Sequence, residues 1–163
     1  MTELEPRWLS AEERVAWLAL LSTTTLLPGV LESPLQQAAK LSLFEYNVLA
    51  MLSEEAGATL PMSELAARTS ASLSRLSHVV KKLQGRGYVE RSVHVDDARV
   101  TEVAITDVGL DLIRELAPMH VESVRTMVFD QLDAKDVADL ARIGAKLVRG
   151  LDESHWTLRT PAP

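Results

Sequence analysis

The sequence predicts a mainly α-helical protein with one small β-hairpin. Apolar residues recur at helical spacing through most of the 163 residues, and Ser, Thr or Asp precedes these segments as a potential cap. Only residues 88–105 contain paired β-branched runs, YVERSVHV and RVTEVAI, which flank a turn at 96–98. A chain of this length can form one domain with its own core, so we expect a single domain over residues 1–163.

The first helix is expected to begin after Ser10, because Ser10 and Glu13 have the spacing of a capping box. It continues through VAWLALLSTTTLL, which is apolar on more than one face. Pro28-Gly29 is expected to kink or end this helix, and Pro34 fits the first turn of a short helix that follows.

Two further helices and a turn are expected in the centre of the chain. Ser42 is a potential cap for the segment LFEYNVLAMLSEEA, which Gly57 ends. Ser63 is expected to cap the short helix ELAAR, and residues 69–71 form the turn before another helix. The side chains of the first segment that we expect in the core are Leu43, Tyr46, Leu49 and Leu52.

The helix that follows Ser72 has one apolar and one polar face. With about 100° per residue and Leu73 at zero, the other apolar side chains fall within an arc of roughly 120°. They are Leu76, Val79, Val80 and Leu83. Ser72 lies on this side and is interpreted as the N-cap. Gly85 and Gly87 are expected to stop the helix. The polar face carries Ser74, Arg75, Ser77, His78, Lys81 and Lys82.

Two helices are expected after the hairpin. Thr106 caps a long helix that ends near Phe129, and Pro118 predicts a kink or a break within it. Asp133 caps the last helix, which Gly150 closes. The apolar side of that helix is formed by Val137, Leu140, Ile143, Leu147 and Val148.

The two ends of the chain are too apolar for a solvated monomer. We therefore expect residues 9–33 and 106–150 to act as dimerisation helices and to build one homodimer interface together.

Positive charge is concentrated in the central segment. The whole chain carries a formal charge of −6, whereas residues 62–99 contain seven cationic and four anionic residues. That segment is therefore +3 and the remainder is −9. A basic surface on an acidic body is compatible with DNA binding, although ordinary surface variation explains the charge alone equally well.

Several functional classes are excluded by the composition. Cys is absent, which excludes disulfides and thiolate metal sites. The start of the chain lacks the pattern of a signal peptide, and no uncharged apolar run reaches the ~20 residues of a membrane span, so we expect a cytoplasmic protein without a membrane partner. The four His residues have no metal-ligand spacing and no phosphate-binding Gly pattern occurs, so neither a metal nor a cofactor is expected. Ser74 and His78 are within reach of each other, but no neighbouring acid orients the His, so we expect no enzyme.

Four segments resemble the MarR family of winged helix-turn-helix regulators: LSLFEYNVLAML, SELA, SRLSHVVKKLQGRGYVER and DDARVTEVAITDVG. The last two are the most specific, because they pair the recognition helix of that family with a wing in which an acidic residue and an Arg lie two apart, here Asp97 and Arg99. The chain departs from the family pattern at Ser70, where Gly is usual, at Leu73, where a polar residue is frequent, and at Pro28-Gly29, where the helix is commonly continuous.

The resemblance implies a homodimeric transcription regulator that binds a pseudo-palindrome in double-stranded DNA, with residues 62–105 as the winged-helix reader. We expect a repressor that a small molecule relieves. A winged helix used as a protein-interaction module is the alternative.

The resemblance also assigns roles to individual side chains. Short or forked polar groups on a helix can contact base edges in the major groove, whereas Lys and Arg more often bind phosphates. The expected base-reading residues are Ser74, Arg75, Ser77 and His78, and the expected phosphate contacts are Ser72, Lys81, Lys82, Arg86 and Arg91. Arg99 is expected to enter the minor groove while Asp97 orients it. A solvated helix face is the alternative reading of these groups, but no acidic residue occurs from 72 to 86.

Family members commonly bind a small aromatic or anionic effector between the dimerisation helices and the reader. The candidate pocket residues here are Trp17, Tyr46, Arg114 and His120. For each of them, a role as a core or solvated side chain is the simpler explanation.

Overall fold

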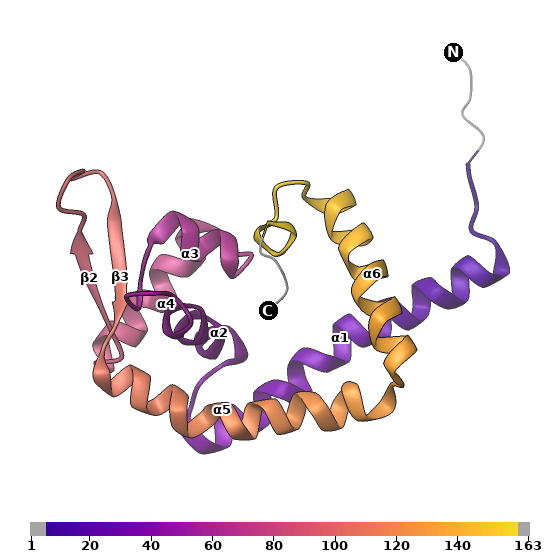
Figure 1. Ribbon diagram of the computed structural model, residues 1–163, viewed down its shortest axis with the longest axis horizontal. Coiled ribbons are helices and arrows are strands. Elements are labelled where there is room, and N and C mark those ends of the chain that lie inside the picture. The colour runs from indigo at the N-terminus through magenta and orange to yellow at the C-terminus, as the bar shows by residue number, and fades with distance from the viewer. Residues whose placement is uncertain (1–5, 160–163) are drawn as a thin grey trace, which may run out of the picture.

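The computed structural model describes residues 6–159 and confirms a mainly helical fold with a small antiparallel sheet (Figure 1). Its elements in chain order are α1 (Ala11–Ala39), α2 (Leu43–Ser53), β1 (Thr59–Pro61), α3 (Met62–Arg68), α4 (Leu73–Gly85), β2 (Val89–Val93), β3 (Thr101–Ile105), α5 (Asp107–Met127), η1 (Phe129–Gln131), α6 (Ala134–Leu151) and η2 (Trp156–Leu158).

The side-chain caps largely follow the sequence. In each confirmed case the capping oxygen accepts the backbone N–H three residues later. The confirmed caps are Ser10, Ser42, Ser72, Thr106 and Asp133. The cap expected at Ser63 is wrong. Helix α3 begins at Met62, directly after β1, and the preceding Pro61 makes no side-chain cap hydrogen bond.

Pro28-Gly29 does not end the first helix, and the separate helix expected at Pro34 is wrong, because both prolines lie inside the continuous helix α1. A kink at Pro28, the other expectation, stays a prediction. Pro118 likewise lies inside the unbroken α5. Proline deprives the carbonyl four residues earlier of its donor. Those carbonyls belong to Thr24, Val30 and Arg114, which are all exposed, so water can replace the lost hydrogen bond. Helix α6 also continues through Gly150 to Leu151.

The sheet contains the expected hairpin and one further strand. Its order is β1-β3-β2, with Val89 opposite Ile105 and Val93 opposite Thr101 in the hairpin. Strand β1 pairs Leu60 with Val103 and was not predicted, because three residues that end in Pro carry no strand pattern.

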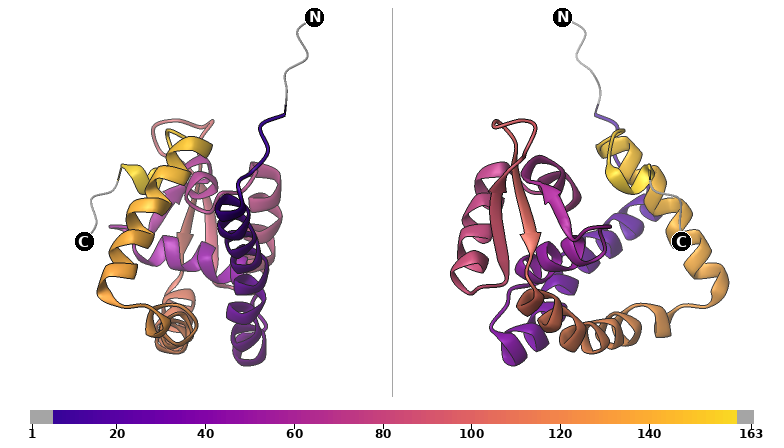
Figure 2. Two further views of the ribbon diagram at one scale, coloured as in Figure 1. Left: turned by 90° about the vertical axis from the view of Figure 1, so that its right-hand side faces the viewer. Right: turned by 60° about the vertical axis from the view of Figure 1, so that its left-hand side comes forward.

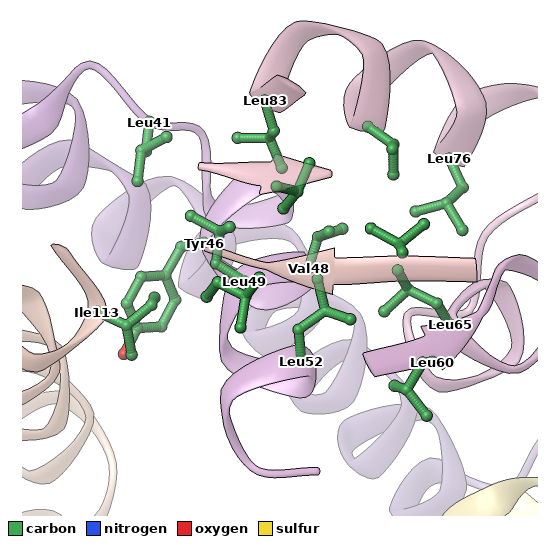
Figure 3. Close-up of a cluster of buried hydrophobic side chains, with 14 of the residues drawn as sticks. Leu41, Tyr46, Val48, Leu49, Leu52, Leu60, Leu65, Leu76, Leu83 and Ile113 are labelled. Atoms are coloured by element: carbon green, nitrogen blue, oxygen red, sulfur yellow. The ribbon is translucent and has the colours of Figure 1, made fainter. Parts of the chain in front are cut away.

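The core lies between α2, α4 and the sheet (Figure 3). Tyr46, Leu49 and Leu52 are buried as predicted, and Leu43 packs at the edge. Close packing continues where the hairpin enters α5, since a Cβ at Gly109 would overlap the carbonyl oxygen of Tyr88. The first turn of α5 is thereby held against the base of the wing.

Helices α1, α5 and α6 extend away from this core. Helix α1 packs against the middle of α5, and α6 turns back at the end of α5 (Figures 1 and 2). Within residues 6–159, α1 is also the one helix long and apolar enough to cross a bilayer by length and composition, a test that helices of soluble proteins can meet. Most of its apolar side chains are exposed in the single chain.

Candidate nucleic-acid interface

Helix α4 separates a buried apolar side from an exposed polar side. Leu76, Val80 and Leu83 are fully buried, whereas Ser74 and His78 are exposed. Arg75 and Lys81 are also exposed, and Ser77 is half-buried. The core therefore fixes which side of α4 faces outward, and that side carries no acidic residue.

The expectation that Leu73 belongs to the core face is wrong. Its side chain is 57% exposed, at the first position of α4. The wheel places Leu73 correctly by angle, but the turn before α4 leaves no core beneath its first residue. Leu73 is instead next to the polar side, where it lines a hollow together with Ser77.

The turn that leads into α4 has the backbone conformation that usually favours glycine. Ser70 adopts a φ of +50°, in the left-handed region. The serine at this position therefore keeps the turn geometry that a glycine provides in the family pattern.

The tip of the wing carries an ion pair between Asp97 and Arg99. Arg99 donates from Nε to Oδ1 at 3.1 Å and from Nη2 to Oδ2 at 3.2 Å, and its backbone N–H donates to Oδ1 at 3.0 Å. The hydrogen bonds from Arg99 lower the pKa of the Asp97 carboxyl. The Arg99 side chain is 90% exposed, so its guanidinium has a fixed direction but remains free to contact a partner.

A hollow of about 340 Å³ lies between α3, α4 and the wing. Arg91 reaches into this region from β2 and donates to the Ser77 hydroxyl at 3.5 Å. Arg99 lines the same hollow. The structure therefore brings Ser77 of α4 together with Arg91, 14 positions later, and Arg99, 22 positions later, in one surface.

Arg75 and Lys82 of α4 and its C-cap residue Arg86 have partners inside the protein. The Arg75 guanidinium lies 4.1 Å from the ring centroid of Phe44. Lys82 Nζ lies 2.6 Å from Oε1 of the buried Glu45. Arg86 is half-buried and donates to two backbone carbonyls at the end of α1. Lys82 and Arg86 therefore differ from Lys81, which has no such partner in the described part of the chain.

The four candidate pocket residues do not form one site in the single chain. Tyr46 and His120 do meet, with ring centroids 4.4 Å apart at the junction of α2 and α5. Trp17 lines a separate apolar hollow of about 630 Å³ between α1 and α6. Arg114 points to solvent and pairs with Asp111 at 2.8 Å.

Among the four candidate pocket residues, Tyr46 and His120 form a contact with a buried and unpaired histidine nitrogen. Burial lowers the pKa of His120, whose Nδ1 is buried without a hydrogen-bond partner. Burial, with a smaller effect of the Glu54 charge, raises the pKa of Tyr46. Both rings are therefore held neutral at the junction between the reader and α5.

Comparison with known proteins matches this architecture along almost the whole chain. A family model described as MarR family matches residues 40–100. The structure of Sco3205, a MarR family transcriptional regulator from Streptomyces coelicolor in complex with DNA, is 37% identical with a TM-score of 0.88, and the match covers 92% of this chain and 94% of that one. The chain belongs to the MarR family.

Two other transcriptional regulators show a likeness to this chain. AbsC from Streptomyces coelicolor is 34% identical with a TM-score of 0.87, over 91% of this chain and 100% of that one. The HTH-type transcriptional regulator YfiV of Bacillus subtilis is 29% identical over 115 residues, which is 71% of this chain and 70% of YfiV. This MarR protein therefore has the winged helix-turn-helix fold, and it belongs to a family of transcriptional regulators.

Proposed function

We propose that this MarR protein binds specific double-stranded DNA as a homodimer, with α4 in the major groove and the wing in the minor groove. The observation that carries the proposal is the exposed face of α4, which has no acidic residue and lies beside the wing. At the tip of the wing, Asp97 orients the Arg99 side chain through two hydrogen bonds. The structure of Sco3205, a relative from Streptomyces coelicolor, is of a complex with DNA. The family supports a regulator rather than an enzyme.

The side chains sort into two kinds of DNA contact. Ser74, Arg75, Ser77 and His78 contact base edges, and the exposed Leu73 adds an apolar contact that suits the methyl group of thymine. Ser72, Lys81 and Arg91 contact phosphates, which position the protein without reading the sequence. Lys82 and Arg86 are left out of the phosphate set because each is engaged by an acceptor inside the protein, although the Lys82 side chain is 58% exposed.

The dimer uses the apolar faces of the terminal helices. Many large apolar side chains of α1 and α6 are exposed, by 36% at Val137 and up to 87% at Leu151. On α1 they include Leu18, Leu21 and Leu26, and on α6 Leu140, Ile143 and Leu147. A second copy of the chain covers these faces, which explains the apolar character of α1 without a membrane and supports a cytoplasmic protein. Two symmetric α4 helices then address half-sites about 34 Å apart.

Regulation is proposed to be repression that a small aromatic or anionic molecule relieves. The neutral Tyr46–His120 pair lies where α2 of the reader meets α5, so a ligand at this junction can favour one arrangement of the two parts over another. Such a ligand acts only if it binds the two arrangements with different affinity. Tyr46 and His120 are the candidate contacts, with Trp17 and Arg114 at the outer surface.

Selection of bound fragments from genomic DNA by the purified protein tests the proposal. We expect enrichment of a pseudo-palindrome, and binding of that site must weaken steeply as salt rises because phosphate contacts release counterions. A shuffled duplex of the same composition is the control. Recovery of no common sequence, or binding that ignores salt, would favour the alternative of a protein-interaction module.

A further inference from the structure

The C-terminal half of α4 is attached to the end of the long helix α1. Arg86, the C-cap residue of α4, donates from Nη2 to the carbonyl of Ala39 at 2.8 Å and from Nη1 to that of Lys40 at 3.1 Å. Ala39 is the last residue of α1, and Lys40 is its left-handed C-cap. Arg86 thus binds two carbonyls at the end of a helix that belongs to the proposed dimer interface.

The chemistry of this contact explains why an arginine is needed. The last carbonyls of a helix lack intrahelical donors and carry partial negative charge. Helix α1 has no basic residue in its own last turn, so Arg86 supplies the positive charge from another element. Its planar fork can serve two acceptors at once. Nη2 also donates to the Tyr88 hydroxyl at 3.3 Å.

One turn earlier, Lys82 makes a second attachment to the same junction. Its ammonium group lies 2.6 Å from Oε1 of Glu45, whose side chain is 3% exposed. The other carboxylate oxygen of Glu45 accepts the backbone N–H of Ser42 at 2.8 Å, in the capping box of α2. Burial opposes ionisation of Glu45, but the bonds from Lys82 and Ser42 lower its pKa overall, so the carboxylate is charged and needs its partner.

The junction is itself joined to α1. Glu32 of α1 accepts the backbone N–H of Leu43, the first residue of α2, at 2.8 Å. Lys82 and Arg86 lie four residues apart and therefore on one side of α4. Ser74 and His78 continue the same i, i+4 row toward the N-terminus of α4, where they are exposed. Only the C-terminal end of this row contacts the 39–45 junction, through Lys82 and Arg86.

We propose that Lys82 and Arg86 are positioning residues that set the orientation of α4 relative to α1, and thereby the spacing of the two DNA half-sites that the dimer accepts. The inference rests on the proposed DNA-binding function. It assigns these two basic residues to spacing selectivity and not to phosphate contact. A rigid attachment of this kind transmits the geometry of the dimer helices to the reading helix.

Two measurements distinguish positioning from phosphate contact. The first is the ratio of affinities for the selected operator and for a duplex with one base pair inserted between its half-sites, which moves them about 3.4 Å apart and rotates them by about a tenth of a turn. The second is the salt dependence of binding, whose slope falls by about 0.9 for each phosphate contact removed.

The variants are Arg86→Gln, Lys82→Gln and Glu45→Gln, with Lys81→Gln as the matched control. Glu45→Gln is the most informative, because a buried side chain cannot touch DNA while glutamine still serves the capping box. We expect all three variants to lower the spacing ratio several-fold with an unchanged salt slope. The effects of Lys82→Gln and Glu45→Gln should not add, since they remove one contact. Lys81→Gln should lower the slope and keep the spacing ratio.

The inference is overturned if Arg86→Gln and Lys82→Gln lower the salt slope as Lys81→Gln does and leave the spacing ratio intact, or if they change neither quantity. If Arg86→Gln does not fold, Arg86→Lys gives the same test, because it keeps the charge but loses the two-carbonyl fork. A wild-type protein that binds no DNA in a salt-dependent way would overturn the proposed function together with the inference. Normal wild-type binding with unaltered spacing ratios overturns the inference alone.

Discussion

Asp97 holds Arg99 at two points of its guanidinium on the tip of the wing, with distances of 3.1 and 3.2 Å. An ion pair this exposed contributes little to the stability of the fold. Its effect is to restrict the direction of a side chain that is otherwise 90% exposed. Less rotamer entropy is then lost when the guanidinium enters a groove, so the pair preorganises the wing for binding.

Arg99→Ala is expected to weaken operator binding while the thermal unfolding midpoint stays within about a degree of the wild type, as is usual for surface substitutions. A lost groove contact of this kind costs about 1–3 kcal/mol of binding free energy. Fluorescence anisotropy at fixed salt measures the change. Asp97→Asn, which keeps the side-chain acceptor but removes the charge, should cause a smaller loss of the same sign.

If Arg99 binds in a narrow minor groove, its contribution to the DNA-binding free energy should depend on the base pairs that the wing contacts. The penalty of Arg99→Ala should shrink when A·T pairs at that position are replaced by G·C pairs, which do not favour a narrow groove. An equal penalty on both duplexes would assign Arg99 to the phosphate backbone instead.

Leu73→Ala is expected to lose the discrimination between thymine and uracil at one position of each half-site. Removing the 5-methyl group from that thymine deprives wild-type Leu73 of about one buried methyl contact, worth about 0.8 kcal/mol or roughly fourfold in affinity. Competition binding with duplexes that carry uracil at single positions measures the effect. The Ala variant should bind both duplexes alike; a uracil penalty that is identical in both proteins at every position would exclude the contact.

Leu73 also shows how far the sequence predicts this surface. Helical spacing correctly placed Leu76, Val80 and Leu83 in the core, because the interior of a helix repeats its environment every turn. It failed at Leu73, because the first residue of a helix extends beyond the neighbours that bury the next turn. The same helical spacing also predicted the exposed polar residues of α4, because they lie on the face opposite the buried side chains.

The internal partners of the basic residues could not be predicted in the same way. Composition identifies Lys82 and Arg86 as cations on a helix without acids, which favours phosphate contact. Their partners come from the α1–α2 junction, about forty positions away for Glu45 and Ala39, and two of the acceptors are backbone carbonyls that no side-chain pattern reveals. The helix end predicted at Pro28 failed for a related reason. A helix continues through a proline where water can hydrogen-bond to the carbonyl four residues earlier, and the sequence does not show whether water reaches that carbonyl.

Leu147→Glu is expected to dissociate the dimer. Leu147 is 46% exposed on α6 and lines the hollow that Trp17 and Leu21 of α1 also line. A carboxylate buried in such an interface without a partner costs several kcal/mol. Sedimentation equilibrium should show a monomer at concentrations where the wild type is dimeric, and operator affinity should fall with it.

The matched control introduces a glutamate on the wing instead of on α6. Val95 is 96% exposed, so Val95→Glu adds the same charge to the chain outside the proposed interface. The dimer should persist in this variant. A Leu147→Glu protein that stays dimeric would locate the interface elsewhere.

His120 is expected to make the stability of the protein fall on mild acidification. Burial lowers the pKa of His120 in the folded chain below the ordinary value of 6.5. The unfolded chain therefore binds a proton that the folded chain does not, in the interval from 6.5 down to the folded pKa. The free energy of unfolding thus decreases as the pH falls through that interval, and it is independent of His120 well above 6.5.

His120→Phe isolates this contribution, because phenylalanine keeps a ring against Tyr46 and removes both the titration and the unpaired Nδ1. The unfolding midpoints of variant and wild type should be similar at pH 8, and the variant should become the more stable protein by a widening margin below pH 6.5. The same substitution at the exposed His78 is the control for replacing a histidine with phenylalanine. Parallel curves for His120→Phe and the wild type would show that this ring is not held neutral by the fold.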